Sequence, residues 1–544
     1  MARGVGIKGR RQFLAASVAL GGAAVAQAEA GAAKPSAMAF AKRAQDQQHQ
    51  VLAGLDAAGL QAELQAGRLS AEALTRHYLK RIEQIDAHGP QLRSVIELNP
   101  EALAQARVLD AERRAGKLRG PLHGLPVLVK DNIASADRMA TTAGSLGLAG
   151  LHARHDAHLI ARLRDAGAVL LGKTNLSEWA NIRSTRSVSG WSSRGGLTRN
   201  PHQLNRNCSG SSSGSGAAAA AGLCALAVGT ETDGSIVSPA SICGVVGLKP
   251  TVGQLSRHGV IPIAAAQDTA GPMTRHVRDA ALLMQALAGA DPNDAATLAA
   301  PRQIDWLAGL KPDALRGARL GIVRASQPPQ PQVNALFERA LAVLKAQGAE
   351  LIDGLEIPSQ AKYAETELTV LLHELRAGLA DYLREFQPDA PFKTLDELVA
   401  WNRAHAAEVM PWFDQELFEQ ALALPQDGAA YREALANNQR YSREEGLDAL
   451  FAQHRLDAVV APTGNLAWLT DKLLGDHFTA GGFTTPFAVA GYPHLTVPMG
   501  AVAGLPAGLS FGGLAWQDAK LLGFGYAYEQ ASRARVEPKF QPGL

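Results

Sequence analysis

One stretch of small residues restricts the fold of this chain more than any other feature: residues 209–216 are all serine or glycine, and five alanines, 217–221, follow at once. Taken alone, such a run is typical of a flexible linker. A linker joins exposed elements, however, whereas the alanine run can only form a helix that packs closely against its neighbours. Serines at the entrance of such a helix bring hydroxyls and backbone N–H groups toward one point. The stretch is therefore compatible with two structures, a flexible linker or a tight turn that leads into a helix. The rest of the sequence distinguishes between them.

A second tight turn is indicated around Ser235, where residues 229–236 read Gly-Thr-Glu-Thr-Asp-Gly-Ser-Ile. In such a turn, successive backbone N–H groups can point the same way and form a nest for an anion. We therefore expect this turn to hold a negatively charged oxygen. The N–H groups concerned belong to Thr232, Asp233, Gly234 and Ser235.

A lysine completes the pattern. Lys130 ends the apolar run 125–129, a position where an arbitrary lysine is usually a solvated residue at a strand terminus. If the strand is buried, the same ammonium group leaves water, and burial lowers the pKa of a lysine. Each of the three features is weak alone, but together they form one specific pattern of two serine turns and a buried amine.

Helix and strand signals alternate along the chain. The apolar runs at 125–129 and 168–171 predict buried strands. Between them, residues 156–166 predict a helix that ends at Gly167. Upstream, Ser70 followed by an apolar stripe that steps by four and three predicts a capped amphipathic helix.

The alternation continues into the second half of the chain, with buried strands predicted at 319–323 and 456–462. It predicts an α/β fold, a single large domain whose central mixed β-sheet is covered by helices on both faces. The segment of about 362–446 has few strand signals, and we expect a helical insertion there. The domain is expected to span residues 51–544.

The first thirty residues differ in kind. Basic residues precede a short apolar run that ends in small residues, which is the layout of a cleaved export signal over residues 1–30. The pair Arg10-Arg11 resembles a twin-arginine signal, so we expect the twin-arginine export machinery as a partner and a periplasmic or secreted protein. The apolar run is too short for stable membrane insertion. Residues 31–50 are expected to be a linker, and a basic disordered tail is the alternative for residues 1–30.

Charge and cysteine content exclude several functions. The 53 basic residues nearly cancel the 51 acidic ones, so no strong positive field is available and we expect no nucleic-acid partner. The three cysteines are too few for a disulfide scaffold, and none has metal-ligand spacing with histidine. We therefore expect no metal and no other cofactor.

Several segments of the chain, taken in their order along the sequence, resemble the amidase signature family. The resemblance covers nearly the whole chain after about residue 50, and the segments that carry it are Gly124–Asn132, Gly172–Ala180, the Gly/Ser turn, Gly234–Ile236, Cys243–Thr251, Gly271–Met273, Ala490–Pro493 and Gly504–Pro506. By position, the resemblance implies Lys130 as the base, Ser211 as the bridging serine and Ser235 as the nucleophile. It also implies that Ser212 supports the turn, and that a cis peptide holds the bridging serine.

The resemblance implies a specific chemistry. A serine hydroxyl attacks a carbonyl only if a base takes its proton, and a lysine can act as that base only when it is neutral. Ser235 would attack an amide carbonyl while Ser211 passes the proton to Lys130. The N–H groups of residues 232–235 would form the oxyanion hole. The expected activity is hydrolysis of a carboxamide C–N bond through an acyl-enzyme.

Two residues depart from the common family pattern. Glu231 stands where an aspartate is usual, which leaves its contact with Ser212 open, and Asp233 replaces a glycine beside the oxyanion nest. The Asp233 carboxylate would repel a substrate that carries its own carboxylate near the cut bond. We therefore hypothesise a preference for small-molecule or short-peptide amides, such as the C-terminal carboxamides that bacterial peptide amidases hydrolyse.

Other functions remain open from the sequence. The A-type subunit of a tRNA-dependent amidotransferase shares the signature, although an export signal speaks against it. A histidine-based serine hydrolase is another candidate, because fifteen histidines are available. Outside enzymology, the chain could be an exported, non-catalytic peptide-binding protein that uses the same Ser/Gly loop.

Overall fold

Buried apolar runs form interior strands of a large sheet. All five residues of β2 (Pro126–Lys130) and of β11 (Ala458–Pro462) are buried. Strands that are buried on both faces read as continuous apolar runs rather than as alternating ones, because helices cover both sides. This is why the sequence signals for these strands were visible.

The structure, a computed structural model, describes residues 52, 54–425, 427–479 and 481–543. The expected export signal at 1–30 and linker at 31–50 lie outside the described residues. The residues from Leu52 onward form one compact unit.

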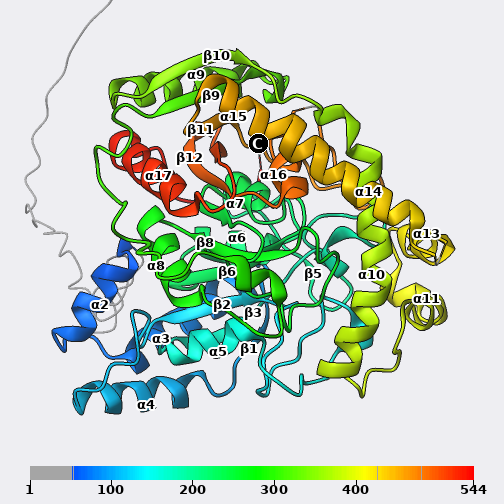
Figure 1. Ribbon diagram of the computed structural model, residues 1–544. Coiled ribbons are helices and arrows are strands. Elements are labelled where there is room, and N and C mark those ends of the chain that lie inside the picture. Colours follow the sequence, from blue (N-terminus) through cyan, green and yellow to red (C-terminus); the bar gives the residue numbers. More distant parts are fainter. Residues whose placement is uncertain (1–51, 53, 426, 480, 544) are drawn as a thin grey trace, which may run out of the picture. The chain divides into compact units, whose positions relative to one another are not determined.

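The predicted α/β fold with a mixed central sheet is confirmed (Figure 1). Parallel pairing joins β3, β2 and β6 on one side and β11, β9 and β10 on the other, whereas the strands between them pair antiparallel. In order across the sheet, the strands are β1 (Val95–Leu98), β3 (Val169–Thr174), β2, β6 (Leu226–Glu231), β8 (Thr269–Thr274), β7 (Val246–Lys249), β12 (His494–Val502), β13 (Leu505–Gly512), β11, β9 (Arg319–Val323) and β10 (Glu350–Leu355). A separate short hairpin joins β4 (Trp191–Ser192) and β5 (Gly196–Leu197).

Helices cover both faces of the sheet. On β12, Leu495 and Val497 lie against Gly525 of one helix, whereas Thr496, between them, lies on the opposite side near Ser241 of another. The helices outside the insertion are α2 (Ala57–Gln65), α3 (Ala71–Arg81), α4 (Ala102–Arg114), α5 (His158–Asp165), α6 (Ser213–Ala220), α7 (Val237–Cys243), α8 (Val277–Leu287), α9 (Pro331–Ala346), α15 (Asp448–His454), α16 (Thr485–Ala490) and α17 (Asp518–Ser532).

Local signals explain where helices begin and end. Ser70 caps α3, because its side chain accepts a hydrogen bond from the backbone N–H of Ala73. Gly167 follows α5 with a φ of +81°, a conformation that favours glycine. The second half of the Gly/Ser run and the first four alanines form α6, and every residue of that helix is buried. The linker interpretation of residues 209–216 was therefore wrong, because small side chains here allow close packing rather than flexibility.

The segment expected to be a helical insertion contains α10 (Ala364–Phe386), α11 (Leu395–Ala404), α12 (Ala406–Val409), α13 (Glu416–Ala423) and α14 (Ala429–Gln439), followed by a π-helix at Arg440–Leu447. Its described residues contain no strand. In Figure 1 these helices lie along one side of the body, in yellow-green to yellow-orange, and α10 packs against α14.

Topology brings the candidate residues to one edge of the sheet. Strands β2 and β6 are parallel neighbours, so their carboxyl ends lie side by side. Lys130 is the last residue of β2, and the 232–235 turn follows β6 directly. The entrance of α6, with Ser211 and Ser212, lies at the same edge.

Among the residues that the structure describes, no helix combines the length and the hydrophobicity that crossing a membrane requires. Cys208, Cys224 and Cys243 are free and buried.

Candidate active site

Lys130 is fully buried, and its ammonium nitrogen has three neighbours. Lys130 Nζ donates to Ser211 Oγ at 2.7 Å, to Thr230 Oγ1 at 2.9 Å and to the Thr230 carbonyl at 3.2 Å. Thr230 lies on β6, the strand beside the one that ends at Lys130. Strand β6 and the turn before α6 thus surround this amine with neutral oxygens.

The charge state of Lys130 follows from this burial. Removal from water lowers the pKa of Lys130 to about 7, although the nearby carboxyl groups of Glu231 and Asp268 act in the opposite direction. Within the described residues, no carboxylate hydrogen-bonds to Lys130 Nζ. A large fraction of this lysine is therefore neutral at neutral pH and able to accept a proton.

Ser211 lies between the lysine and the second serine. The Gly210–Ser211 peptide bond is cis, and Ser211 Oγ donates to Ser235 Oγ at 3.0 Å. Hydroxyl hydrogens rotate freely, so the same contacts can run from Ser235 through Ser211 to Lys130. The structure therefore brings the three predicted residues together in one continuous chain. Within the described residues, neither hydroxyl is hydrogen-bonded to a histidine.

The turn after β6 leaves four backbone donors free. In the described part of the chain, the N–H groups of residues 232–235 donate to no protein acceptor, whereas the next two, from Ile236 and Val237, both donate to Glu231 Oε2 at 2.7 and 3.0 Å. Gly234 has a φ of +74°, which lets the chain reverse direction tightly before Ser235. Free N–H groups that precede and include a serine are the arrangement expected of an oxyanion hole.

Ser212 and Glu231 support the site separately. Ser212 Oγ donates to the Thr230 carbonyl at 2.9 Å and accepts from the Thr230 N–H at 3.2 Å, and the Ser212 N–H donates to the Ser235 carbonyl at 3.1 Å. The Glu231 carboxylate turns away from Ser212 toward the start of α7. The longer Glu231 side chain instead reaches the N–H groups of the two residues that follow Ser235.

Asp268 and Gln267, which the sequence did not single out, both form hydrogen bonds with Thr232. The Thr232 hydroxyl donates to Asp268 Oδ1 at 2.5 Å, and Gln267 Nε2 donates to the Thr232 carbonyl at 3.2 Å. Gln267 also donates to Glu367 of α10 at 2.9 Å, which connects the helical insertion to the 232–235 turn. No local pattern marks either residue, because both act on a segment more than thirty positions away.

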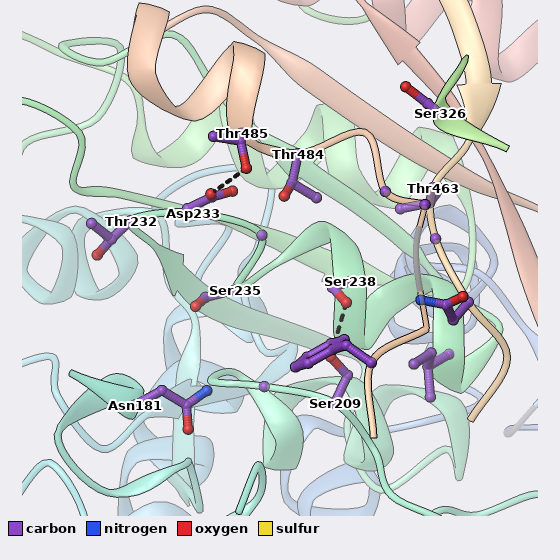
Figure 2. Close-up of a pocket in the computed structure, with 18 of the residues that line it drawn as sticks. Asn181, Ser209, Thr232, Asp233, Ser235, Ser238, Ser326, Thr463, Thr484 and Thr485 are labelled. Carbon is purple, nitrogen blue, oxygen red and sulfur yellow. Dashed lines mark hydrogen bonds between the residues drawn. The ribbon is translucent and has the colours of Figure 1, made fainter. Parts of the chain in front are cut away.

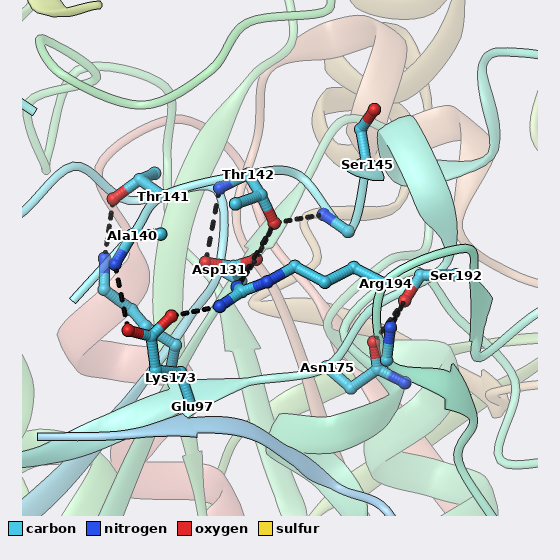
Figure 3. Close-up of polar contacts among 12 residues, drawn as sticks. Glu97, Asp131, Ala140, Thr141, Thr142, Ser145, Lys173, Asn175, Ser192 and Arg194 are labelled. Carbon is cyan, nitrogen blue, oxygen red and sulfur yellow. Dashed lines mark hydrogen bonds and ion pairs between the residues drawn. The ribbon is translucent and has the colours of Figure 1, made fainter. Parts of the chain in front are cut away.

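Two further side chains near Lys130 belong to Asn132, at the end of a signature segment, and to Thr230, on β6. Asn132 Nδ2 donates to Thr230 Oγ1 at 2.9 Å, the same oxygen that accepts from Lys130. The neighbouring Asp131 belongs to a second buried network, in which its carboxylate accepts from the hydroxyl of Thr142 and from Arg194 (Figure 3). These contacts fix the chain on the carboxyl side of Lys130.

Ser235 opens onto a cavity of about 620 Å³ (Figure 2). Asp233 lies in the wall of this cavity, where Thr485 Oγ1 donates to Asp233 Oδ2 at 2.7 Å and Oδ1 has no partner among the described residues. Burial raises the pKa of Asp233, so the repulsive charge that the sequence suggested is weakened. Asp233 is the only charged residue among the described residues that line the cavity.

Comparison with known proteins agrees with this fold. The family model described as Amidase matches residues 73–522. The matched segment and the similar proteins define an amide-hydrolysing enzyme. The chain belongs to the amidase family, and the resemblance drawn from the signature segments is confirmed.

Individual relatives cover most of the chain. The crystal structure of a peptide amidase from Stenotrophomonas maltophilia is 50% identical, with a TM-score of 0.86, over 90% of this chain and 99% of that one. A probable amidase of Arabidopsis thaliana is 39% identical, over 87% of this chain and 89% of its own length. The A-type subunit of the glutamyl-tRNA(Gln) amidotransferase from a Synechococcus strain is 36% identical, over 89% and 94%.

Proposed function

We propose that this enzyme hydrolyses primary carboxamides, above all the C-terminal amides of peptides, through an acyl-enzyme on Ser235. The observation that carries the proposal is the continuous chain from Ser235 Oγ through Ser211 Oγ to Lys130 Nζ, with contacts of 3.0 and 2.7 Å. A buried lysine whose pKa is lowered to about 7 is suited to accept a proton at neutral pH.

The first half of the reaction forms the ester. Ser235 Oγ bonds to the substrate carbonyl carbon, while its proton passes to Ser211 and the proton of Ser211 passes to Lys130. The C–N bond then breaks, and Ser211 delivers a proton to the nitrogen while Lys130 returns its proton to Ser211. Ammonia leaves, and the acyl group remains on Ser235.

The second half releases the acid. A water molecule attacks the ester carbonyl and gives its proton to the same relay, and the Ser235 oxygen regains a proton as the ester bond breaks. In both halves the carbonyl oxygen gains negative charge. The free N–H groups of Thr232, Asp233, Gly234 and Ser235 are placed to stabilise that charge.

The preference for amides over free acids follows from the charges around the cavity. A peptide with a free C-terminal carboxylate needs a cation beside the cut position, and the described lining residues include no lysine or arginine. Asp233 adds negative character when ionised. A neutral carboxamide meets no such penalty. The similarity to the peptide amidase of S. maltophilia supports the same substrate class.

The proposal is tested by measuring ammonia release from a dipeptide amide and amino-acid release from the matching free dipeptide. We expect hydrolysis of the amide alone. The Ser235→Ala variant, checked for folding by its melting temperature, should release no ammonia above the buffer rate. Equal rates on both substrates, or cleavage of the free dipeptide only, would contradict the assigned substrate class.

The relatives also include one component of an amidotransferase, so a second candidate is transfer of amide nitrogen within a larger complex. Glutamine-dependent amidation of glutamyl-tRNA tests that candidate, and we expect none. A non-catalytic binding protein would keep Ser235 without reactivity. We expect a fluorophosphonate serine probe to label the peptide that contains Ser235, whereas a folded but unlabelled protein would favour binding.

We further propose that the enzyme is exported through the twin-arginine machinery to the periplasm or the medium. The support is the Arg10-Arg11 pair within the signal-like first thirty residues. Cell fractionation of the full chain and of an Arg10→Lys, Arg11→Lys variant tests this proposal. Retention of the variant in the cytoplasm is the expected result, and unchanged export would contradict it.

A further inference from the structure

The catalytic cavity has an aromatic wall on an exposed loop. Trp468 and Phe478 both line the cavity that contains Ser235, and their ring centroids lie 4.6 Å apart. Trp468 is buried, but Phe478 is 63% exposed. An aromatic ring left uncovered beside a catalytic serine offers apolar surface that a bound substrate can remove from water.

Polar contacts hold the loop that carries this pair. Trp468 Nε1 donates to Asp476 Oδ1 at 3.3 Å, and the same carboxylate accepts from the Ser189 N–H at 3.1 Å. At the base of the loop, Asn465 Nδ2 donates to the Thr479 carbonyl at 2.8 Å. The aromatic wall is therefore positioned before substrate binds, and its exposure does not result from an unanchored loop.

The cavity leads from Ser235 to this wall along α7. Ser238 and Ile242 lie one turn apart on α7 and both line the cavity, so Ile242 is about 6 Å further along the helix axis. Ile242 packs in the same apolar cluster as Trp468. Ser238 itself lies beyond Ser235, and one residue of an extended peptide covers about 3.3 Å, so the wall lies beyond the residue that carries the reacting carbonyl.

The size of the products decides which part of the substrate faces the wall. Ammonia, the leaving group in the proposed function, needs little room, so the acyl part of the peptide must occupy most of a cavity of about 620 Å³. An acidic side chain against Trp468 and Phe478 would lose water without gaining a partner of opposite sign, because Asp233 is the one charged residue in the described lining. An apolar side chain would instead cover both rings.

We propose, building on the proposed function, that Ile242, Trp468 and Phe478 form a subsite for an apolar side chain on the residue that precedes the amidated C-terminal residue of a peptide. The subsite selects among peptide amides by their second residue from the C-terminus. It takes no part in the chemistry at Ser235.

The test measures kcat/KM for acetyl-Xaa-glycinamides in which Xaa is phenylalanine, leucine, glycine or aspartate. The wild-type enzyme should prefer phenylalanine and leucine to glycine by about tenfold or more, and aspartate should be poorest. Phe478→Ala should remove most of the preference for phenylalanine and leucine while changing the rate on the glycine substrate less than about threefold. Phe478→Leu should keep part of the preference.

The matched control is Leu473→Ala. Leu473 lies on the same loop and is 68% exposed, but it does not line the cavity, so this variant should match the wild type on every substrate. The inference is overturned if Phe478→Ala lowers all four rates equally, or if only the C-terminal position, probed with acetyl-glycyl-phenylalaninamide, responds. Release of ammonia without any preference for Xaa overturns the subsite alone, whereas no ammonia release from any peptide amide overturns the proposed function.

Discussion

The hydroxyl of Thr232 donates a 2.5 Å hydrogen bond to Asp268, so the first residue of the oxyanion loop is held by a carboxyl group 36 positions further along the chain. Asp268 in turn accepts from the N–H groups of Ile263 and Ala264 at 2.8 and 3.0 Å. The loop that should stabilise negative charge is thus fixed from outside before any substrate binds. Preorganised donors of this kind account for much of the rate enhancement in acyl transfer.

Replacement of Thr232 by valine should lower kcat by about 10- to 100-fold with little change in KM, because the backbone donor is kept but loses its anchor. Steady-state kinetics on a peptide amide measure the effect. The control is Thr232→Ser, which keeps the hydroxyl and should retain most of the activity. A valine variant with wild-type kcat would show that the contact with Asp268 is unimportant.

The activity should depend on pH through Lys130. This lysine has to be neutral to accept a proton, so its protonation below a pKa of about 7 should inactivate the enzyme. We expect kcat/KM to rise with pH, about tenfold per unit on the acid side, and to level off above pH 7. Lys130→Arg should be inactive at every pH up to 9, because a guanidinium stays protonated. An acid limb centred near pH 4 would assign the titration to another group.

Removal of the bridging hydroxyl should separate the nucleophile from its base. In Ser211→Ala, Ser235 is retained, but the 2.7 Å and 3.0 Å contacts that connect it with Lys130 are lost. We expect kcat to fall by about 100- to 10,000-fold, with slow residual labelling of Ser235 by a fluorophosphonate probe. Ser235→Ala should show no labelling of this peptide. Activity of the Ser211 variant close to the wild type would mean that Lys130 reaches the nucleophile by another path.

Glu231 should matter for stability more than for the chemical step. Its carboxylate accepts from the N–H groups of Ile236 and Val237, and both groups are buried. Glu231→Ala leaves two buried donors without a partner, which should cost about 2–4 kcal/mol and lower the melting temperature. Glu231→Gln keeps one acceptor oxygen and should lose less. Equal melting temperatures for the wild type and the alanine variant would contradict this role.

Much of the candidate site could be predicted because local sequence specifies it. Lys130 ends a run of consecutive apolar residues, and such a run forms a strand buried on both faces. Ser211 and Ser235 lie in turns that require small residues, and glycine at 234 permits the positive φ before the nucleophile. These features depend on neighbours in the chain, so they are visible without the fold.

Tertiary structure decided the rest. The lowered pKa of Lys130, the partners of Thr232 and the use of Glu231 at the start of α7 all arise where separate segments pack together. The aromatic wall also depends on tertiary structure. Phe478 lies more than 200 positions from Ser235 in the sequence, and the two residues line the same cavity only because the chain folds. Sequence alone identified the groups that we propose carry the chemistry, since strand burial and turn geometry follow from adjacent residues. Packing determined the charge state of those groups, their hydrogen-bond partners and the walls of the cavity. Burial and long-range hydrogen bonds depend on residues that no local pattern connects.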